Sequence, residues 1–487
     1  MKPYFVTTRT LLRDRRSARV FSIAALTLAL GGCATFTPDG GMQPVAQGVA
    51  TAISMDTAKI ASPEDAANVE ARVRALLKKP LTADAAVQIA LINNRGLQVA
   101  YNALGVSEAA FVEASLPPNP VIGVERLATG GELEIERRVI ANALALLTLP
   151  ARSDIAKTQF EAARQRAIEA TFRTAAEARR AYYRAIAASQ IASFLEQART
   201  SADAAADLMG KLGETGGAKK LDQARANAFY AEVSNQLAEA RINVGVEREA
   251  LTRAMGLWGN DIGYKLPGQL PAMPRIQTEK QVEVSAVRRR VDLIAARLEL
   301  DAMAKTLGLT NATRFISALD AGWRGNYERV TEDGVRQSSA PQGFELEIQI
   351  PIFDLGEVKV RRSAEMYMQA VNRLMEKAVN VRSEARAAYL TYRGRYDVAR
   401  QYQNKILPLR RTINEQAQLE YNGMLIDVFE LLTTARESIT TNVSAIAAKR
   451  DFFIATVDFQ TSIIGGGSGG SSEANATTVA SAGGDND

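Results

Sequence analysis

The sequence predicts a mainly helical protein with a few two-faced strands, arranged as two similar halves. Three observations support this fold class: apolar and small residues recur at heptad spacing over long stretches, two short stretches alternate between apolar and charged residues, and a strand–proline–helix passage occurs twice. The chain has 487 residues, of which 47% are hydrophobic. That composition is typical of a folded protein larger than one ordinary domain.

The long helices are predicted by the spacing of apolar and small residues. In the second half of the chain the repeating positions are Val371, Leu374, Ala378, Val381, Ala385, Ala388 and Tyr392. In the first half, between residues 153 and 212, they are Ala167, Ala170, Thr174, Ala181, Ala188 and Leu195. This 3,4 spacing indicates helices packed along their length, and about 60 residues of helix would be roughly 90 Å long. Ser153 and Asp354 are the expected N-caps. Periodicity alone also fits an ordinary helical bundle.

Two-faced strands are predicted by strict alternation. In residues 344–350 the apolar Phe344, Leu346, Ile348 and Ile350 alternate with the polar Glu345, Glu347 and Gln349. In "RFISALDAGWRGNYE" Phe315, Leu319, Ala321, Trp323 and Tyr327 fall on one side, and Arg314, Asp320, Arg324, Asn326 and Glu328 on the other. A transmembrane barrel needs this pattern, apolar toward lipid and polar toward water, with Trp323 and Tyr327 suited to its interfacial girdle. A hairpin with one solvated face on a soluble core fits it as well. The strands expected within residues 119–150, around "PNPVIGVERL" and "VIANALALLTL", alternate less clearly.

An internal repeat is indicated by the two proline passages, "ALLTLPARSDIAKTQFEAA" around Pro150 and "EIQIPIFDLGEVKVRRSAE" around Pro351. Each half is expected to follow the order helix, two strands, long helix, glycine-containing tip, helix. The predicted boundaries are 81–265 for the first repeat and 282–463 for the second. Residues 33–80 are expected to form an N-terminal extension that ends in a short helix, and 464–487 a flexible Gly/Ser-rich tail.

The first 32 residues have the pattern of a signal peptide. A basic stretch is followed by the short apolar core "VFSIAALTLALGG", and Leu30, Gly31 and Gly32 stand directly before Cys33. This resembles a bacterial lipoprotein cleavage site, which implies a palmitate-type lipid anchor on Cys33; the alternative is an incidental cysteine after an ordinary signal. Six basic residues and one acidic residue lie in this segment, which accounts for the whole net charge of +5. The remainder is neutral and gives no indication of a nucleic-acid partner.

Catalytic chemistry is poorly represented in the sequence. The chain has no histidine and its one cysteine belongs to the signal, so no histidine-based triad or histidine metal ligand is available. No glycine-rich phosphate loop stands between a strand and a helix. We therefore expect a non-enzyme without cofactor or metal.

At this point the sequence resembles a known family, the outer-membrane efflux proteins, or TolC-like outer-membrane factors, in their lipoprotein branch. The matching stretches cover about residues 81 to 463 and are "LTADAAVQIALINNRGLQVA", "LPPNPVIGVE", "IPIFDLGEVKVRRSA", "KILPLRR" and "EYNGMLIDVFELL". The resemblance implies long helical hairpins that form an α-barrel tunnel and four membrane strands per protomer. Three protomers would close a twelve-stranded barrel.

The resemblance also implies site residues. The tips that contact a periplasmic adaptor would include Gly213, Gly216, Gly217, Tyr421, Gly423 and Met424, with the glycines supplying the tight turns. Asp427 and Glu430, three residues apart on one helix face, would form an acidic gate at the tunnel aperture; a solvated helix face without a gating role is the alternative. The barrel lumen would be lined by Glu345, Glu347, Gln349 and Arg324. Pro150 and Pro351 would mark the bend between barrel and tunnel.

The function that follows is a passive exit duct in the outer membrane, with its tunnel in the periplasm, serving tripartite efflux or type I secretion. Its partners would be a periplasmic adaptor (membrane fusion) protein, an inner-membrane pump, outer-membrane lipid and two further copies of the chain. The alternative is a periplasmic helical scaffold lipoprotein without a pore. Strand pairing in 119–150 and 314–352 distinguishes the two, because a pore needs membrane strands and a scaffold needs none.

Overall fold

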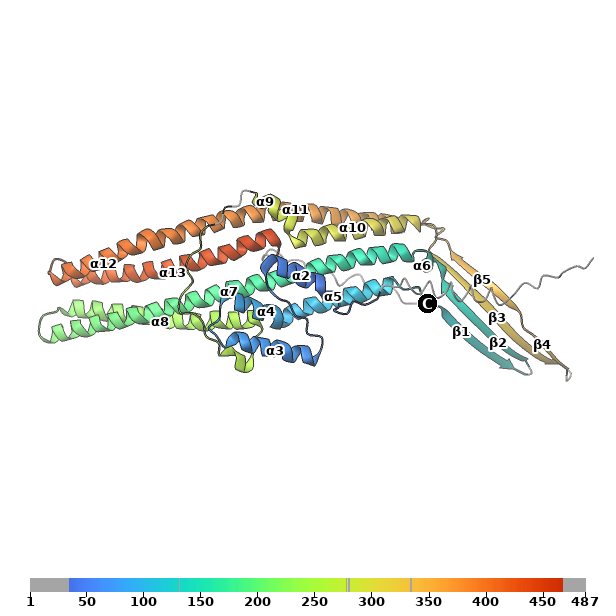
Figure 1. Cartoon of the computed structure of the whole chain (residues 1–487), viewed down its shortest axis with the longest axis horizontal. Coiled ribbons are helices and arrows are strands. Elements are labelled where there is room, and N and C mark those ends of the chain that lie inside the picture. The colour runs from blue at the N-terminus through green and yellow to red at the C-terminus, as the bar shows by residue number, and fades with distance from the viewer. Residues whose placement is uncertain (1–34, 131, 277, 279–280, 333–334, 467–487) are drawn as a thin grey trace, which may run out of the picture. The chain divides into compact units, whose positions relative to one another are not determined.

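A computed structural model describes residues 35–130, 132–276, 278, 281–332 and 335–466. The chain is mostly helical with one small sheet (Figure 1) and divides into two compact units. The strand unit comprises, of the described residues, 35–40, 107–159 and 304–364, and the helical unit comprises the rest. Cys33, the signal segment and the tail beyond residue 466 lie outside the described residues.

The strand unit contains one antiparallel sheet. Its strands are β1 (Val121–Thr129), β2 (Glu132–Asn142), β3 (Ala318–Glu332), β4 (Val335–Ser339) and β5 (Gln342–Gln349). β1 pairs with β2, β2 with β3, and β3 with both β4 and β5 (Figure 1). β4 and β5 keep the same register on β3, so they are two pieces of one strand interrupted at Pro341, which has no N–H to donate. The expected four strands are therefore present, with the last one divided.

The sequence prediction was wrong about the end of the second strand. Residues 143–147 of "VIANALALLTL" form the short helix α6 (Ala143–Leu147), not a strand. Asn142 ends β2 and caps α6, because its Oδ1 accepts a hydrogen bond from the Ala145 backbone N–H at 2.6 Å. An asparagine side chain at an N-cap offers the backbone this local alternative to a ladder.

The remaining elements of the described chain are helices. They are α2 (Met42–Ile53), α3 (Pro63–Leu77), α4 (Ala83–Asn93), α5 (Arg95–Ala114), α7 (Leu149–Glu214), α8 (Lys220–Met255), η2 (Gly259–Ile262), α9 (Val282–Arg289), α10 (Val291–Ala312), α11 (Glu357–Gln401), η3 (Tyr402–Ile406), α12 (Leu407–Asn422) and α13 (Val428–Ile464). The N-terminal extension holds two helices where one was expected. The second of these, α3, starts with a capping box formed by Ser62 and Asp65. None of the described helices is apolar enough over a sufficient length to cross a bilayer.

The two longest helices pack along the predicted seams. α7 has 66 residues and α11 has 45. All the predicted seam positions on α7 except Thr174 are buried, and on α11 the buried ones are Val381, Ala385 and Tyr392. After α11 the chain forms η3, a π-helical segment that ends at Ile406, two residues before Pro408. Pro408 lies in the first turn of α12. The wider turn accommodates a proline that cannot donate to the preceding turn.

Both predicted N-caps were wrong. Ser153 lies inside α7, which already begins at Leu149, and its hydroxyl lies 2.7 Å from that of Ser115. α11 begins three residues after Asp354, whose Oδ1 instead accepts from the Gly356 N–H at 3.1 Å. α7 therefore begins one residue before its proline, whereas α11 begins six residues after its proline.

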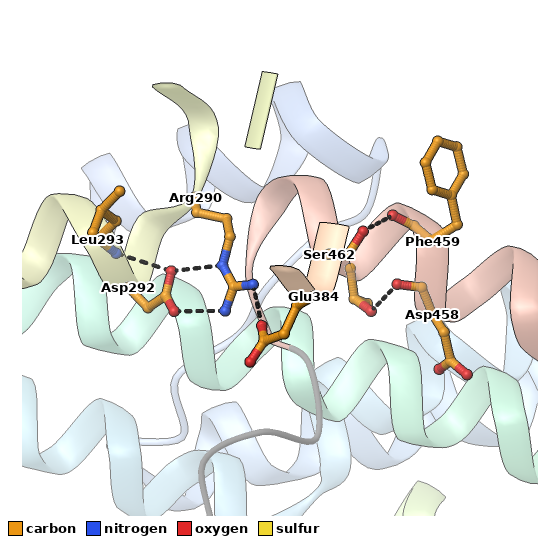
Figure 2. Close-up of polar contacts among 8 residues, drawn as sticks. Arg290, Asp292, Leu293, Glu384, Asp458, Phe459 and Ser462 are labelled. Atoms are coloured by element: carbon orange, nitrogen blue, oxygen red, sulfur yellow. Dashed lines mark hydrogen bonds and ion pairs between the residues drawn. The ribbon is translucent and has the colours of Figure 1, made fainter. Parts of the chain in front are cut away.

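A buried ion-pair network holds the start of α10 against α11 (Figure 2). The guanidinium of Arg290 donates to both carboxylate oxygens of Asp292, at 3.0 and 2.8 Å, and to Glu384 at 2.5 Å. Asp292 also accepts from the Leu293 backbone N–H at 2.9 Å, and Arg290 and Asp292 are only 6% and 5% exposed. On α13 the Ser462 hydroxyl donates to the carbonyl of Phe459. Every polar group of the Arg290–Asp292 pair therefore has a partner, as burial requires.

Candidate functional site

The sheet has one polar face that gathers the four predicted lumen residues. Because opposite residues in antiparallel strands point to the same side, the register places Glu345, Glu347, Gln349 and Arg324 together. The same face carries Glu125, Glu132, Glu134, Glu136, Arg138, Asp320, Asn326 and Glu328. The residues named here give this face eight carboxylates and two guanidinium groups.

Polar side chains on this face are connected to one another. Arg324 forms an ion pair with Glu136 at 2.9 Å across β2 and β3. Asn326 donates through Nδ2 to Glu134 at 2.7 Å and to Glu328 at 2.8 Å. The three remaining predicted residues, on β5, are all exposed. The arrangement gives one side of the sheet a strongly acidic, hydrophilic surface.

The opposite face of the sheet is apolar and lacks carboxylates among the described strand residues. Val139, Trp323 and Phe344 stand side by side across three strands, and Phe344 is 95% exposed. Further apolar residues on this face are Ile122, Val124, Ile135, Ala141, Leu319, Ala321, Tyr327, Leu346 and Ile348. An exposed apolar patch of this kind marks a surface that meets lipid or a partner.

The passage from β5 to α11 depends on a tight turn that the sequence prediction missed. After Pro351 the backbone turns through Leu355 and Gly356, which have φ of 49° and 74°. The Leu355 N–H donates to the Pro351 carbonyl at 2.8 Å. A Cβ on Gly356 would lie 2.1 Å from the backbone oxygen of Arg314, directly before β3. The turn thus fixes the start of the long helix against the start of a neighbouring strand. Pro150 lies in the first turn of α7, a position where proline is well tolerated.

The first predicted tip connects α7 to α8. Gly216 has φ 77°, and the N–H groups of Gly217 and Ala218 both donate to the Leu212 carbonyl, at 2.7 and 3.2 Å. This closes the C-terminus of α7 in the manner of a left-handed cap. Gly213 lies within the last turn of α7, where a Cβ would be 2.0 Å from the amide of Gln223.

The second predicted tip connects α12 to α13, and it corrects the expected role of Gly423. Gly423 has φ −82°, and the left-handed residue is Met424 at φ 58°. The Leu425 N–H closes the turn on the Glu420 carbonyl at 2.8 Å. Tyr421 is half-buried, whereas Met424 and Leu425 are 93% and 78% exposed. This tip therefore presents two bare apolar side chains.

Of the predicted acidic pair, Glu430 lies within a helix and Asp427 does not. Asp427 is the N-cap of α13, with φ −88° and ψ 171°, and lies before the helix. Its Oδ1 accepts from the Glu430 backbone N–H at 2.9 Å, while both side chains are exposed. The spacing of three arises because an N-cap side chain reaches the third helical N–H.

Contacts between the two helical hairpins were missing from the sequence prediction. Arg436 on α13 forms an ion pair with Glu232 on α8 at 2.8 Å, and its guanidinium lies 5.5 Å from the ring centroid of Phe229. Arg225 on α8 lies over the ring of Phe429 on α13 at 4.9 Å. Partners 204 residues apart give no local pattern in the sequence.

Comparison with solved structures places this fold. CusC, studied for transmembrane channel formation, is 16% identical over 81% of this chain and 92% of its own, with a TM-score of 0.66. The Campylobacter jejuni outer membrane channel CmeC is 16% identical over 79% and 86%, with a TM-score of 0.68. The Vibrio cholerae outer membrane protein VceC is 13% identical over 82% and 97%, with a TM-score of 0.64.

Sequence comparisons add no further assignment, since no protein-family model and no curated protein matches the chain. The structural agreement extends over nearly the whole length of each of these channels. The chain has the fold of the TolC-like outer-membrane channels.

Proposed function

We propose that this protein is a passive channel in the outer membrane, the exit duct of a tripartite efflux or type I secretion system. The observation that carries the proposal is the two-faced sheet, polar and acidic on one side and apolar on the other, whose strands continue into long helices. A sheet of this kind suits a wall between water and lipid. The fold shared with outer membrane channels supports the same conclusion.

Three copies of the chain would complete the barrel. β1 and the β4–β5 strand are the two edges of the sheet, and neither edge has a partner strand within the described chain. Pairing each β1 with the β4–β5 edge of the next copy gives a closed barrel of twelve strands, which leaves no backbone edge in lipid. Glu345, Glu347, Gln349 and Arg324 would then line the lumen.

The two repeats, 81–265 and 282–463, would each contribute one hairpin to a helical tunnel in the periplasm. An adaptor protein would bind at the tips, where Met424 and Leu425 offer exposed apolar contacts and Gly216 allows the turn. An inner-membrane pump would supply the energy. The lipoprotein-like start adds a lipid anchor at Cys33. The chain itself would perform no chemistry.

The decisive experiment is single-channel conductance of the purified full-length protein in planar bilayers, with the oligomer mass measured in parallel. A trimer with discrete, ion-selective openings supports the duct. Monomers without conductance would overturn it and favour a scaffold lipoprotein without a pore.

The acidic gate at Asp427 and Glu430 is a separate part of the proposal. Three copies would bring six carboxylates toward the tunnel axis, where they attract cations. Larger single-channel currents after Glu430→Ala, a change that leaves the helix cap intact, would support the gate. Unchanged currents would leave these residues with a structural role only.

A further inference from the structure

The apolar face of the sheet changes character along the strands in an ordered way. At the end connected to the helices the cross-strand partners are aliphatic, with Leu319 beside Ile348 and Ala321 beside Leu346. Trp323 and Phe344 come next. Toward the hairpin ends four arginines, Arg126, Arg137, Arg329 and Arg336, appear on the same face, interspersed with Ile135, Tyr327 and Leu133.

The register groups these four arginines as two diagonal pairs. Arg126 stands opposite Ile135, so it lies diagonal to Arg137 two residues farther along β2. Arg329 stands opposite Ser338, so it lies diagonal to Arg336 on β4. Diagonal neighbours across antiparallel strands are about 7–8 Å apart, within the joint reach of two arginine side chains.

The carboxylates of the described strands are confined to one face of the sheet. The four arginines are exposed, and none of them pairs with a carboxylate among the described residues. Every described carboxylate of the strands points to the other face. An ordinary solvated surface would mix the two signs, whereas this face has unpaired positive charge beside an apolar band.

We propose that the two pairs, Arg126 with Arg137 and Arg329 with Arg336, bind phosphorylated lipid headgroups of the outer leaflet. The inference rests on the proposed function, since it requires the apolar face to meet lipid. Along the strands this face changes from aliphatic to aromatic to basic residues. The same order is found in a bilayer, from the hydrocarbon core through the interface to the anionic headgroups. Arginine can lay its stem on the apolar surface and extend its guanidinium outward.

The chemistry favours phosphomonoesters. Guanidinium groups bind phosphate oxygens bidentately, and two guanidinium groups in joint reach suit a group that carries close to two negative charges. Trp323 supports the site locally, because its ring lies over Gly325, the cross-strand partner of Arg137. The aromatic ring thereby extends to the register level of Arg137 on the same face of the sheet.

The test measures lipid binding to the full-length protein in neutral detergent by native mass spectrometry. The probes are bis-phosphorylated lipid A, lipid A without its phosphates, and phosphatidylglycerol. Arg126→Gln with Arg137→Gln is compared with Arg138→Gln and Arg324→Gln, a matched pair on the polar face that removes the same charge. We expect the first pair of changes to weaken lipid A binding at that arginine pair about tenfold or more, seen as one fewer lipid A bound per chain, because two charged hydrogen-bonding groups are lost there. The control should change lipid A binding little.

Several results would overturn the inference: equal losses in both double variants, binding that ignores removal of the phosphates, or phosphatidylglycerol bound as tightly as lipid A. The comparison of phosphorylated with dephosphorylated lipid A uses the unaltered protein, so it remains decisive if a variant does not fold. Planar-bilayer conductance separates the two proposals. A conducting trimer without phosphate preference refutes the lipid site alone, whereas a protein that neither inserts nor conducts refutes both.

Discussion

Replacing Gly356 with alanine should destabilise the strand unit strongly. The residue has φ 74°, a conformation in which a side chain costs about 1–2 kcal/mol. The added Cβ would also lie 2.1 Å from the backbone oxygen of Arg314, more than 1 Å inside normal contact. Relief of that overlap requires movement of the main chain, at about 1–3 kcal/mol for typical overpacking. We therefore expect a loss of about 2–5 kcal/mol in the free energy of unfolding.

Two other glycines of the same unit provide controls. A Cβ on Gly343 or Gly308 meets nothing within 4 Å, and neither residue has positive φ. Gly343→Ala should be nearly neutral, and Gly308→Ala, inside α10, should stabilise by up to about 1 kcal/mol through helix propensity.

Tryptophan fluorescence can report the unfolding of this unit alone. The chain has two tryptophans, so Trp258→Phe leaves Trp323 on β3 as the only reporter. Denaturant unfolding of the purified protein in detergent is then compared among the glycine variants in this background. A Gly356→Ala variant within about 0.5 kcal/mol of Gly343→Ala would refute the steric account of the turn.

Three further predictions concern the helical unit. Asp427→Ala should lower the free energy of unfolding by about 1 kcal/mol in chemical denaturation, whereas Glu430→Ala should have a smaller effect, because only Asp427 caps α13; equal effects would contradict this. Arg290→Met should lower it by about 3–5 kcal/mol by leaving Asp292 buried without its partner, and Asp292→Leu added to it should recover part of the loss; a double variant less stable than the single one would refute this account. Burial, followed by the nearby Asp292 carboxylate, raises the pKa of Glu169 above its ordinary value of 4.5. The folded state then holds this proton more tightly than the unfolded state, so stability should fall as pH rises from about 4.5 through the raised pKa and stay reduced above it. Unfolding midpoints measured from pH 4 to 8 should fall less steeply with pH in Glu169→Gln than in the unaltered protein. Identical pH profiles of the two proteins would contradict this prediction.

Features with a local period could be predicted from the sequence. Heptad spacing located α7 and α11, and strict alternation located β3 and β5 with their polar and apolar faces. The weaker alternation of β1 and β2 still places their glutamates and Arg138 on the shared polar face. These patterns can be recognised in the sequence because packing along a helix or across a sheet requires an apolar residue at the same spacing many times.

Features that depend on a single distant contact could not be predicted. The need for glycine at 356 arises from the carbonyl of Arg314, and the ion pair of Arg436 from Glu232 on another hairpin. The N-caps of α7 and α11 were predicted wrongly for a related reason. A proline followed three residues later by a polar residue is compatible with several first residues of a helix, and only the backbone geometry selects one. At the second tip, Met424 has the left-handed conformation that glycine favours, whereas the neighbouring Gly423 has negative φ. The residue types alone would have predicted the opposite.

If three chains close the proposed barrel, the open edges at β1 and β5 constrain the order of its assembly. Joining two chains edge to edge buries two edges but leaves two others free, as many as a single chain has. In the proposed three-chain barrel, only the third chain would remove every free edge, and it would do so in one event. A pair of chains therefore gains contact area without losing its tendency to capture any other unpaired strand. Partly assembled species should consequently be short-lived, and escort of the single chain to the membrane should matter more for yield than the stability of the finished barrel.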